Sequence, residues 1–208
     1  AMIQEKRGML KTWNVSLVLA TGILAILGTF LVRSGILDSI HAFGASTLGV
    51  PFVSLIGVMI AGSVALIVTR RAALRSEHRL DSLLSREAVF LGNNLVLVGL
   101  AFVVFWGTFF PLISEAVTGE KAAVGPPWFD RYTVPLALVL VLLSGIGPVI
   151  AWRRATLANA RRNFLWPVVA AAVTLVALIA FGVTQNAAAM TMFALAAFVV
   201  VVIGQELA

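Results

Sequence analysis

The chain has 208 residues, of which 61% are hydrophobic and only 12% are charged, and its mean hydropathy is +1.04. About a quarter of the residues of a soluble domain are charged, so this composition excludes an ordinary soluble protein. It predicts an all-α, polytopic integral membrane protein. The net charge of +6 does not indicate nucleic-acid binding, because the basic residues lie in short clusters between apolar runs. The absence of cysteine excludes disulfides and thiolate metal sites.

Six apolar runs are long enough to cross a bilayer, which takes about 20 residues in a helix. The charged residues Asp, Glu, Lys and Arg occur in these runs only at the ends. The predicted spans cover roughly residues 13–33, 50–69, 89–110, 133–152, 164–183 and 187–205. We expect them to form a single helical membrane domain over residues 1–208, with a tight turn around TQNA between the last two.

The basic residues fall unevenly on the two sides of these predicted spans. Of the 15 Lys and Arg residues, all but Arg33, Lys121 and Arg131 precede the first span or lie in the second and fourth connections. Because Lys and Arg accumulate in cytoplasmic loops, both termini are predicted to be cytoplasmic. The connection that contains His41 is then predicted to face outward.

The stretch GTFLVRSGILDSIHAFG, residues 28–44, brings Arg33, Asp38 and His41 to the outer end of the first span. A guanidinium at this position stabilises the C-terminus of a helix, and it is also shaped to bind a carboxylate through two hydrogen bonds. His41 is either an ordinary interfacial histidine or a metal ligand. On a helical turn Asp38 would share a face with His41 and would accept a hydrogen bond from one ring nitrogen. The residues alone leave both alternatives open.

Other polar and aromatic positions have plainer explanations. His78 lies in a charged cytoplasmic connection and is expected to be solvated, and Pro148 predicts a kink near the cytoplasmic end of the fourth span. The connection 111–132 is expected to be an interfacial segment whose aromatic residues either anchor the fourth span or receive a partner protein. All five tryptophans fall near predicted span ends, so we interpret them as boundary markers rather than as a site.

Several stretches together resemble the CcmF family of c-type cytochrome biogenesis proteins, in the family's order. They are LKTWNVSLVLAT, GTFLVRSGILDSIHAFG, LLSREAVFLGNNLVLV, GTFFPLISEAVTGEKAAVGPPWF and GIGPVIAWRR, and the resemblance covers essentially the whole chain. It implies a haem lyase subunit of the bacterial cytoplasmic membrane, which receives haem from a periplasmic haem chaperone. The subunit would help to attach that haem to the C-x-x-C-H motifs of apocytochrome c, together with other cytochrome c maturation subunits and surrounded by membrane lipid.

The family has four haem-binding histidines, two in membrane spans for a resident b-type haem and two that face outward beside a tryptophan-rich segment. His41 resembles the second outward-facing histidine, so the resemblance implies that His41 ligates the iron of the delivered haem. With His41 as that ligand, the chemistry of the neighbouring side chains predicts that Arg33 binds the haem propionates and that Asp38 orients the imidazole. The other three histidines would lie outside this chain, which we expect to be an interior fragment, inactive alone. No catalytic residue is assigned.

Two other functions stay open at this point. A related haem lyase subunit, dedicated to nitrite-reductase cytochromes, would share these motifs. A small-solute permease belongs to a different class and would require a charged or broken helix near the middle of the membrane. None of the six predicted spans has such a feature.

Overall fold

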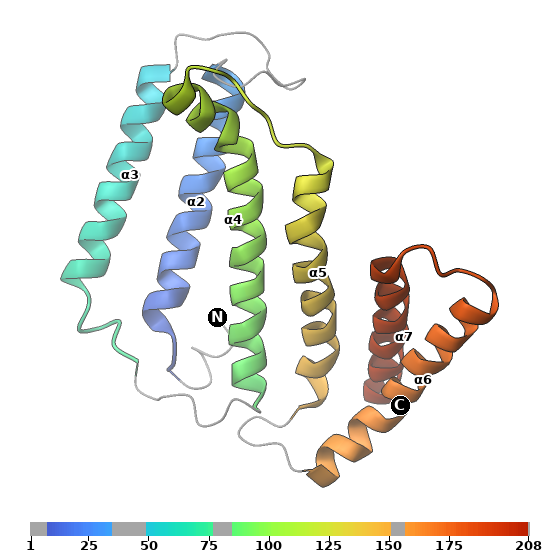
Figure 1. The fold of residues 1–208 in the computed structure, drawn as a ribbon. Coiled ribbons are helices and arrows are strands. Elements are labelled where there is room, and N and C mark those ends of the chain that lie inside the picture. Colours follow the sequence, from blue (N-terminus) through green and yellow to red (C-terminus); the bar gives the residue numbers. More distant parts are fainter. Residues whose placement is uncertain (1–7, 35–48, 77–84, 151–156, 208) are drawn as a thin grey trace. The chain divides into compact units, whose positions relative to one another are not determined.

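The computed structural model describes residues 8–34, 49–76, 85–150 and 157–207 (Figure 1). Within these ranges every regular element is an α-helix, as predicted. The helices are α2 (Lys11–Ser34), α3 (Gly49–Thr69), α4 (Arg86–Thr118), α5 (Pro126–Val149), α6 (Leu157–Ala180) and α7 (Ala187–Leu207). Each contains a stretch that is long and apolar enough to cross a membrane. The chain is therefore a multi-pass membrane protein, and the predicted fold class is confirmed.

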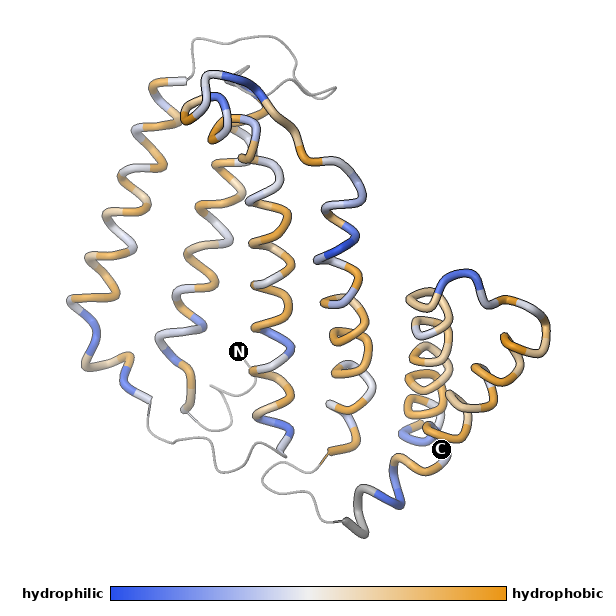
Figure 2. Tube along the Cα trace, viewed as in Figure 1, coloured by the Kyte–Doolittle hydropathy of each residue, from blue (hydrophilic) through white to orange (hydrophobic). Residues whose placement is uncertain are grey.

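The helices expose many of their apolar side chains. Val50, Phe102 and Val173, on three different helices, are all more than half exposed. Figure 2 shows hydrophobic residues along the length of each helix and hydrophilic residues mainly near the helix ends. In water this surface would be strongly unfavourable, whereas in a bilayer the lipid tails cover it and each helix satisfies its own backbone hydrogen bonds.

The chain forms two compact units, Ala1–Arg79 and Leu80–Ala208. In the first unit α2 and α3 lie side by side, and the rings of Phe30 and Phe52 approach each other with centroids 6.4 Å apart. The turn after α3 returns to the beginning of α2, where the Thr12 hydroxyl donates a hydrogen bond of 3.1 Å to the Leu74 carbonyl. The first residues of α2 and the last residues of α3 therefore lie at the same end of this unit.

In the second unit α5 packs against both α4 and α7, and α6 packs against α7. The buried core between α5 and α7 consists of Val149, Phe198 and Val202, with Ile146, Phe164, Ala171 and Val199 around it. The Phe164 and Phe198 rings are nearly parallel, with centroids 6.1 Å apart. Gly145 lies directly against the Phe198 ring, and the absence of a side chain there allows the two helices to approach closely.

Each predicted span overlaps one helix, but the boundaries around the third connection differ from the prediction. Helix α4 continues to Thr118, and it ends at Gly119, which has φ 76° and donates its N–H to the Glu115 carbonyl at 3.0 Å. Helix α5 begins at Pro126, because proline costs nothing in the first positions of a helix, where the N–H has no partner. Most of the segment 111–132 is thus helical, and the connection itself covers 119–125.

The fourth and fifth spans are also displaced from their predicted bounds. Helix α5 ends at Val149, so Pro148 lies inside the helix, in its last turn. Helix α6 begins at Leu157 and ends at Ala180, before Gly182 with its φ of 73°. Asn186 caps α7 by accepting a hydrogen bond of 3.1 Å from the Ala189 N–H. The predicted tight turn is thus the short connection between Ala180 and Ala187.

Candidate functional site

Arg33 is the one predicted site residue that lies among the described residues. It occupies the last turn of α2, where its side chain is exposed and its charge complements the carbonyl end of the helix. Leu31, two residues earlier, is buried. His41, the predicted iron ligand, and Asp38, which we expect to orient it, lie outside the described residues, as does His78. Their placement relative to Arg33 therefore stays a prediction.

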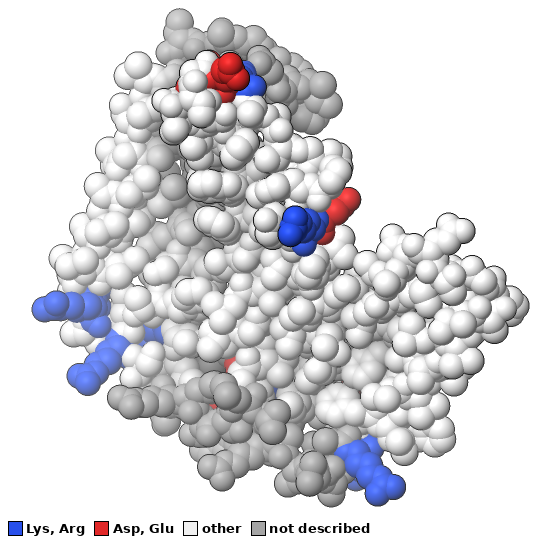
Figure 3. Space-filling model, in the orientation of Figure 1, with Lys and Arg blue, Asp and Glu red and all other residues white. Residues whose placement is uncertain are grey.

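Basic side chains gather at one end of each unit. In the first unit the more basic end carries Lys11, Arg70, Arg71 and Arg75, and the other end carries only Arg33 among the described residues. In the second unit the more basic end carries Arg86, Arg161 and Arg162, and the other end carries Lys121 and Arg131. In Figure 3 the charged side chains form small groups that are separated by uncharged surface. Each unit alone thus has the asymmetry on which the predicted orientation is based, and the orientation itself stays a prediction.

The last carbonyls of α5 form a cluster that accepts hydrogen bonds from two other helices. Arg86, at the beginning of α4, donates from Nε to the Ile150 carbonyl at 3.1 Å and from Nη2 to the Pro148 carbonyl. Asn163 of α6 donates from Nδ2 to the Val149 carbonyl at 3.0 Å. Carbonyls at a helix C-terminus have no partner within the helix, so these bonds satisfy three of them and join α4, α5 and α6. We call residues 148–150 with Arg86 and Asn163 the carbonyl cluster.

The beginning of α4 is buried together with this cluster. Ser85 caps the helix by accepting a hydrogen bond of 3.2 Å from the Ala88 N–H, and both Ser85 and Glu87 are fully buried. A carboxylate in the first turn of a helix is stabilised by the helix dipole. Glu87 was not among the predicted site residues; its carboxylate lies in the first turn of α4, beside the Ser85 cap.

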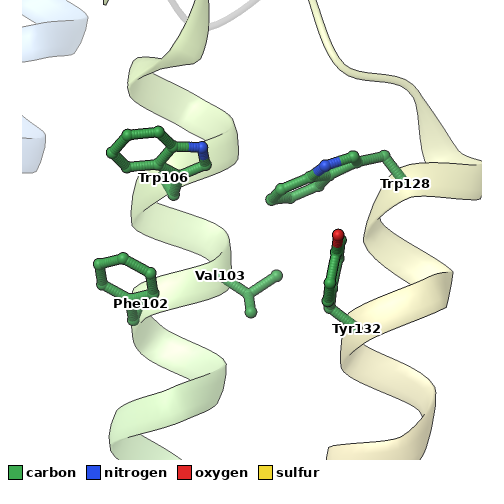
Figure 4. Close-up of a pocket in the computed structure, with 5 residues that line it drawn as sticks. All are labelled: Phe102, Val103, Trp106, Trp128 and Tyr132. Atoms are coloured by element: carbon green, nitrogen blue, oxygen red, sulfur yellow. The ribbon is translucent and has the colours of Figure 1, made fainter.

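A pocket of about 330 Å³ lies between α4 and α5, toward the end of the pair that carries the connection 119–125 (Figure 4). Its lining is apolar and largely aromatic, and consists of Phe102, Val103, Trp106, Trp128 and Tyr132. We call it the aromatic pocket. Two of its five residues, Trp106 and Trp128, are tryptophans whose place near the span ends predicts only boundary markers.

A buried glycine allows the aromatic residues of α5 to approach α4 beside this pocket. A Cβ atom at Gly107 would overlap the ring of Phe129 and would lie 3.1 Å from the indole of Trp128. The ring of Trp128 meets that of Phe129 edge to face at a centroid distance of 5.1 Å, and it meets Tyr132 at 5.0 Å. These contacts fix the orientation of the Trp128 side chain, and with it one wall of the pocket.

Among the residues that the structure describes, no three His, Cys, Asp or Glu side chains lie close enough to hold a metal ion. His41, the predicted iron ligand, lies outside the described residues. A protein histidine and a porphyrin suffice to ligate haem iron, so a cluster of this kind is not needed for the predicted chemistry.

Comparison with known proteins gives consistent relatives, although no family model matches the chain. The cytochrome c-type biogenesis protein CycK of Rhizobium meliloti is 40% identical over 164 residues, which are 78% of this chain and 24% of that protein. The cytochrome c-type biogenesis protein CcmF of Pseudomonas aeruginosa is 38% identical over 201 residues, which are 95% of this chain and 30% of CcmF. The probable cytochrome c-type biogenesis protein NrfE of Escherichia coli is 32% identical over 74% of this chain and 28% of its own length.

A solved structure, described as the cytochrome c heme lyase CcmF, has the same fold over 99% of this chain and 30% of its own, with a TM-score of 0.68. Its sequence identity of 24% supports the fold alone. The chain spans less than a third of the length of each of these relatives.

Proposed function

The chain is homologous to the cytochrome c-type biogenesis proteins CcmF and CycK over the part of them that it spans, and we propose that it is a membrane section of a haem lyase subunit for cytochrome c maturation. The observation that carries this proposal is the 38% identity to CcmF over 95% of the chain. The identity to NrfE is lower, at 32% over 74% of the chain, and gives no reason to prefer that relative.

The distribution of charge supports this function over a small-solute permease. In the described helices, Asp, Glu, Lys and Arg lie near the helix ends, and α3 carries none. A permease would need an ionisable group or an interrupted helix near the middle of the membrane, where its solute binds. The described spans are continuous helices with apolar middles. Such spans suit a protein whose chemistry takes place at the membrane surface.

In the proposed role, a periplasmic haem chaperone delivers haem to the face of the membrane at which α2 ends. His41 follows Arg33 by eight residues in the chain, and its neutral imidazole would ligate the haem iron at the surface, without transfer of haem into the lipid. The exposed guanidinium of Arg33 suits the propionate carboxylates of that haem, which it would bind through two hydrogen bonds. Asp38 would hold the imidazole ring by a hydrogen bond to its other nitrogen.

This role also defines the surroundings of the protein. The chain would lie in the cytoplasmic membrane of a bacterium, with His41 on the periplasmic side. Its partners would be the haem chaperone, apocytochrome c with its C-x-x-C-H motif, and other cytochrome c maturation subunits. The ligands of any resident b-type haem would be supplied by parts of the full-length protein outside residues 1–208.

Replacement of His41 by Ala in the full-length protein tests the proposal. Covalent haem in a reporter cytochrome c should fall by more than roughly 10-fold, because loss of a residue that merely hydrogen-bonds to a metal ligand already costs about 10- to 100-fold. Arg33→Ala should have a smaller effect, and Arg33→Lys should restore only part of the activity if both hydrogen bonds to a propionate matter. His78→Ala is the matched control and should mature cytochromes normally. Added imidazole should partly rescue His41→Gly, because it can occupy the vacated axial position.

Two outcomes would contradict different parts of the proposal. Normal maturation by His41→Ala, at the wild-type level of membrane-inserted protein, would make His41 an ordinary interfacial histidine. Normal cytochrome c in a strain that lacks the whole protein, together with the loss of uptake of a small solute, would replace the haem lyase function by that of a permease.

A further inference from the structure

The aromatic pocket between α4 and α5 has the size and chemistry of a binding site, and the proposed haem function does not use it. Its volume of about 330 Å³ lies at the lower end of the range for small-molecule sites. Figure 4 shows Val103 pointing from α4 toward Trp128 and Tyr132 of α5. The side chains of Phe102, Trp106 and Tyr132 are 40 to 60% exposed, so the pocket is open to the surroundings of the helix pair.

The surroundings of this pocket are the hydrocarbon of the bilayer. Phe102 lies sixteen residues after Arg86 in a continuous helix, which places it about 24 Å farther along the axis. The hydrocarbon core is about 30 Å thick, so a residue at this distance from the charged beginning of α4 lies in the half of the core nearer to the connection 119–125. An occupant of the pocket therefore enters from the lipid rather than from water.

The lining favours an apolar chain over a cation. Aromatic cages bind quaternary ammonium groups, but inside a membrane such a group would need a nearby negative charge. The five lining residues include no charged side chain. Asp130 follows Trp128 by two residues on α5, a spacing that directs it to the opposite side of the helix. Flat rings and the Val103 methyl groups instead suit the methylene groups of an acyl chain.

Arg131 adds a site for a phosphate beside the opening. It is exposed, and it stands three residues after Trp128 and one before Tyr132, so it flanks the face of α5 that lines the pocket. A long arginine side chain near a helix end extends toward the membrane surface and keeps its aliphatic stem in the lipid. Its guanidinium binds phosphate through two hydrogen bonds.

From this arrangement we propose that the aromatic pocket binds one acyl chain of a phospholipid whose phosphate is held by Arg131. The lipid would fill the gap between α4 and α5 and act as a fixed part of the helix pair, in contrast to the exchangeable lipid around the other helices. This site is independent of the haem function, since none of its residues takes part in the proposed role of His41 and Arg33.

Native mass spectrometry of the delipidated full-length protein tests the proposal, with phosphatidylglycerol as the titrated probe. The wild-type protein should bind one phospholipid at low concentration, before the nonspecific lipids. Val103→Phe fills the pocket and should abolish this first binding event, whereas Val104→Phe, at an exposed neighbour on the same helix, should leave it unchanged. Arg131→Gln should weaken the first binding about 10-fold, because a hydrogen bond to a charged group is lost. Diacylglycerol, which lacks the phosphate, should bind the wild-type protein as weakly as phosphatidylglycerol binds Arg131→Gln.

A phosphatidylglycerol with a photoactivatable acyl chain locates the binding site directly. Its crosslinks should concentrate on the peptides that contain Phe102–Trp106 and Trp128–Tyr132. An even distribution over the exposed faces of α3 and α6 would mean ordinary surrounding lipid and would overturn the proposal. The proposal would also be overturned if Val103→Phe and Val104→Phe bound the first phosphatidylglycerol with equal affinity. A wild-type dimer that Val103→Phe dissociates would overturn it too, because a second copy of the chain would then occupy the pocket. Arg131→Gln changes an exposed side chain, so it tests the site even if Val103→Phe fails to insert.

Discussion

Two glycines of α5 provide a matched test of how the second unit is packed. A Cβ atom at Gly145 would lie 2.7 and 2.9 Å from two ring carbons of Phe198 and 3.0 Å from Val199 Cγ2. At Gly147, two residues later, the nearest atom would be Val89 Cγ1 at 3.6 Å, an ordinary van der Waals contact. Phe198 is only 5% exposed, so its ring has little space into which it can move. Gly145→Ala should therefore strain the contact between α5 and α7, and Gly147→Ala should not.

The expected free energies follow from two opposing effects. Overpacking of a filled core costs about 1–3 kcal/mol. Alanine gains about 0.8–1 kcal/mol over glycine in helix propensity. Gly145→Ala should thus lower the free energy of unfolding by about 0–2 kcal/mol, while Gly147→Ala should raise it by up to about 1 kcal/mol. The difference between the two variants is the overpacking term alone, about 1–3 kcal/mol.

Unfolding of the full-length protein by SDS in mixed micelles, followed by circular dichroism, measures this difference. Shortening the facing ring with Phe198→Leu should relieve the overlap, so the double variant Gly145→Ala/Phe198→Leu should lose less stability than the two single losses add up to. Equal unfolding midpoints for Gly145→Ala and Gly147→Ala would refute the reasoning. They would show that α7 can move away from α5 at no measurable cost.

Two further predictions concern the helix ends. Arg86→Lys keeps the charge but loses the planar pair of donors to the last carbonyls of α5. It should lower the free energy of unfolding by about 1–3 kcal/mol in the same SDS titration. The control is Arg75→Lys, at an exposed turn, and equal stability of the two variants would contradict the prediction. In an otherwise cysteine-free full-length protein, single cysteines at Ser39 and Ala122 should react with an impermeant thiol reagent in intact cells and a cysteine at Ser76 should not. The opposite pattern would reverse the predicted orientation.

The helices were predictable from the sequence because a bilayer leaves the backbone few alternatives. An apolar run of about 20 residues must satisfy its own hydrogen bonds, and a helix does this within the run. The ends of helices were less predictable, because a helix does not have to stop where the lipid stops. Helix α4 continues through Ser114 and Glu115 until Gly119 takes a left-handed conformation, and α5 begins at the two prolines 126 and 127. Capping residues, rather than hydropathy, determine these boundaries.

The carbonyl cluster could not have been predicted from the sequence pattern. The sequence pattern makes Arg86 one basic residue of a predicted cytoplasmic connection, yet its guanidinium donates hydrogen bonds to carbonyls 62 and 64 residues away. The acceptors are backbone carbonyls, which every residue has, so the sequence does not identify them. The only indication is that the last carbonyls of any helix, here those at the end of α5, need donors from outside the helix. Arg33 could be placed at the end of its helix, because a helix C-terminus favours a cation regardless of neighbouring spans.

The tryptophans show a second limit of sequence patterns. Their distance from the span ends is visible in the sequence, and it led to their interpretation as boundary markers. The direction in which each ring points depends on the neighbouring helix, and the sequence does not contain that information directly. Trp106 and Trp128 lie on α4 and α5 and line the same pocket, because α5 packs beside α4 and Gly107 makes room for Phe129.

Helix α5 contacts both α4 and α7 through a phenylalanine ring packed against a glycine. Gly107 of α4 accommodates the ring of Phe129 from α5, and Gly145 of α5 accommodates the ring of Phe198 from α7. In lipid there is little hydrophobic gain when two apolar helices meet, so their association depends on close van der Waals contact and on hydrogen bonds. A phenylalanine ring against a glycine provides a large contact of this kind, and the carbonyl cluster adds hydrogen bonds at the end of α5. Because the glycine contacts are local, α4 and α5 can meet closely at Gly107 and still leave the aromatic pocket open beside it.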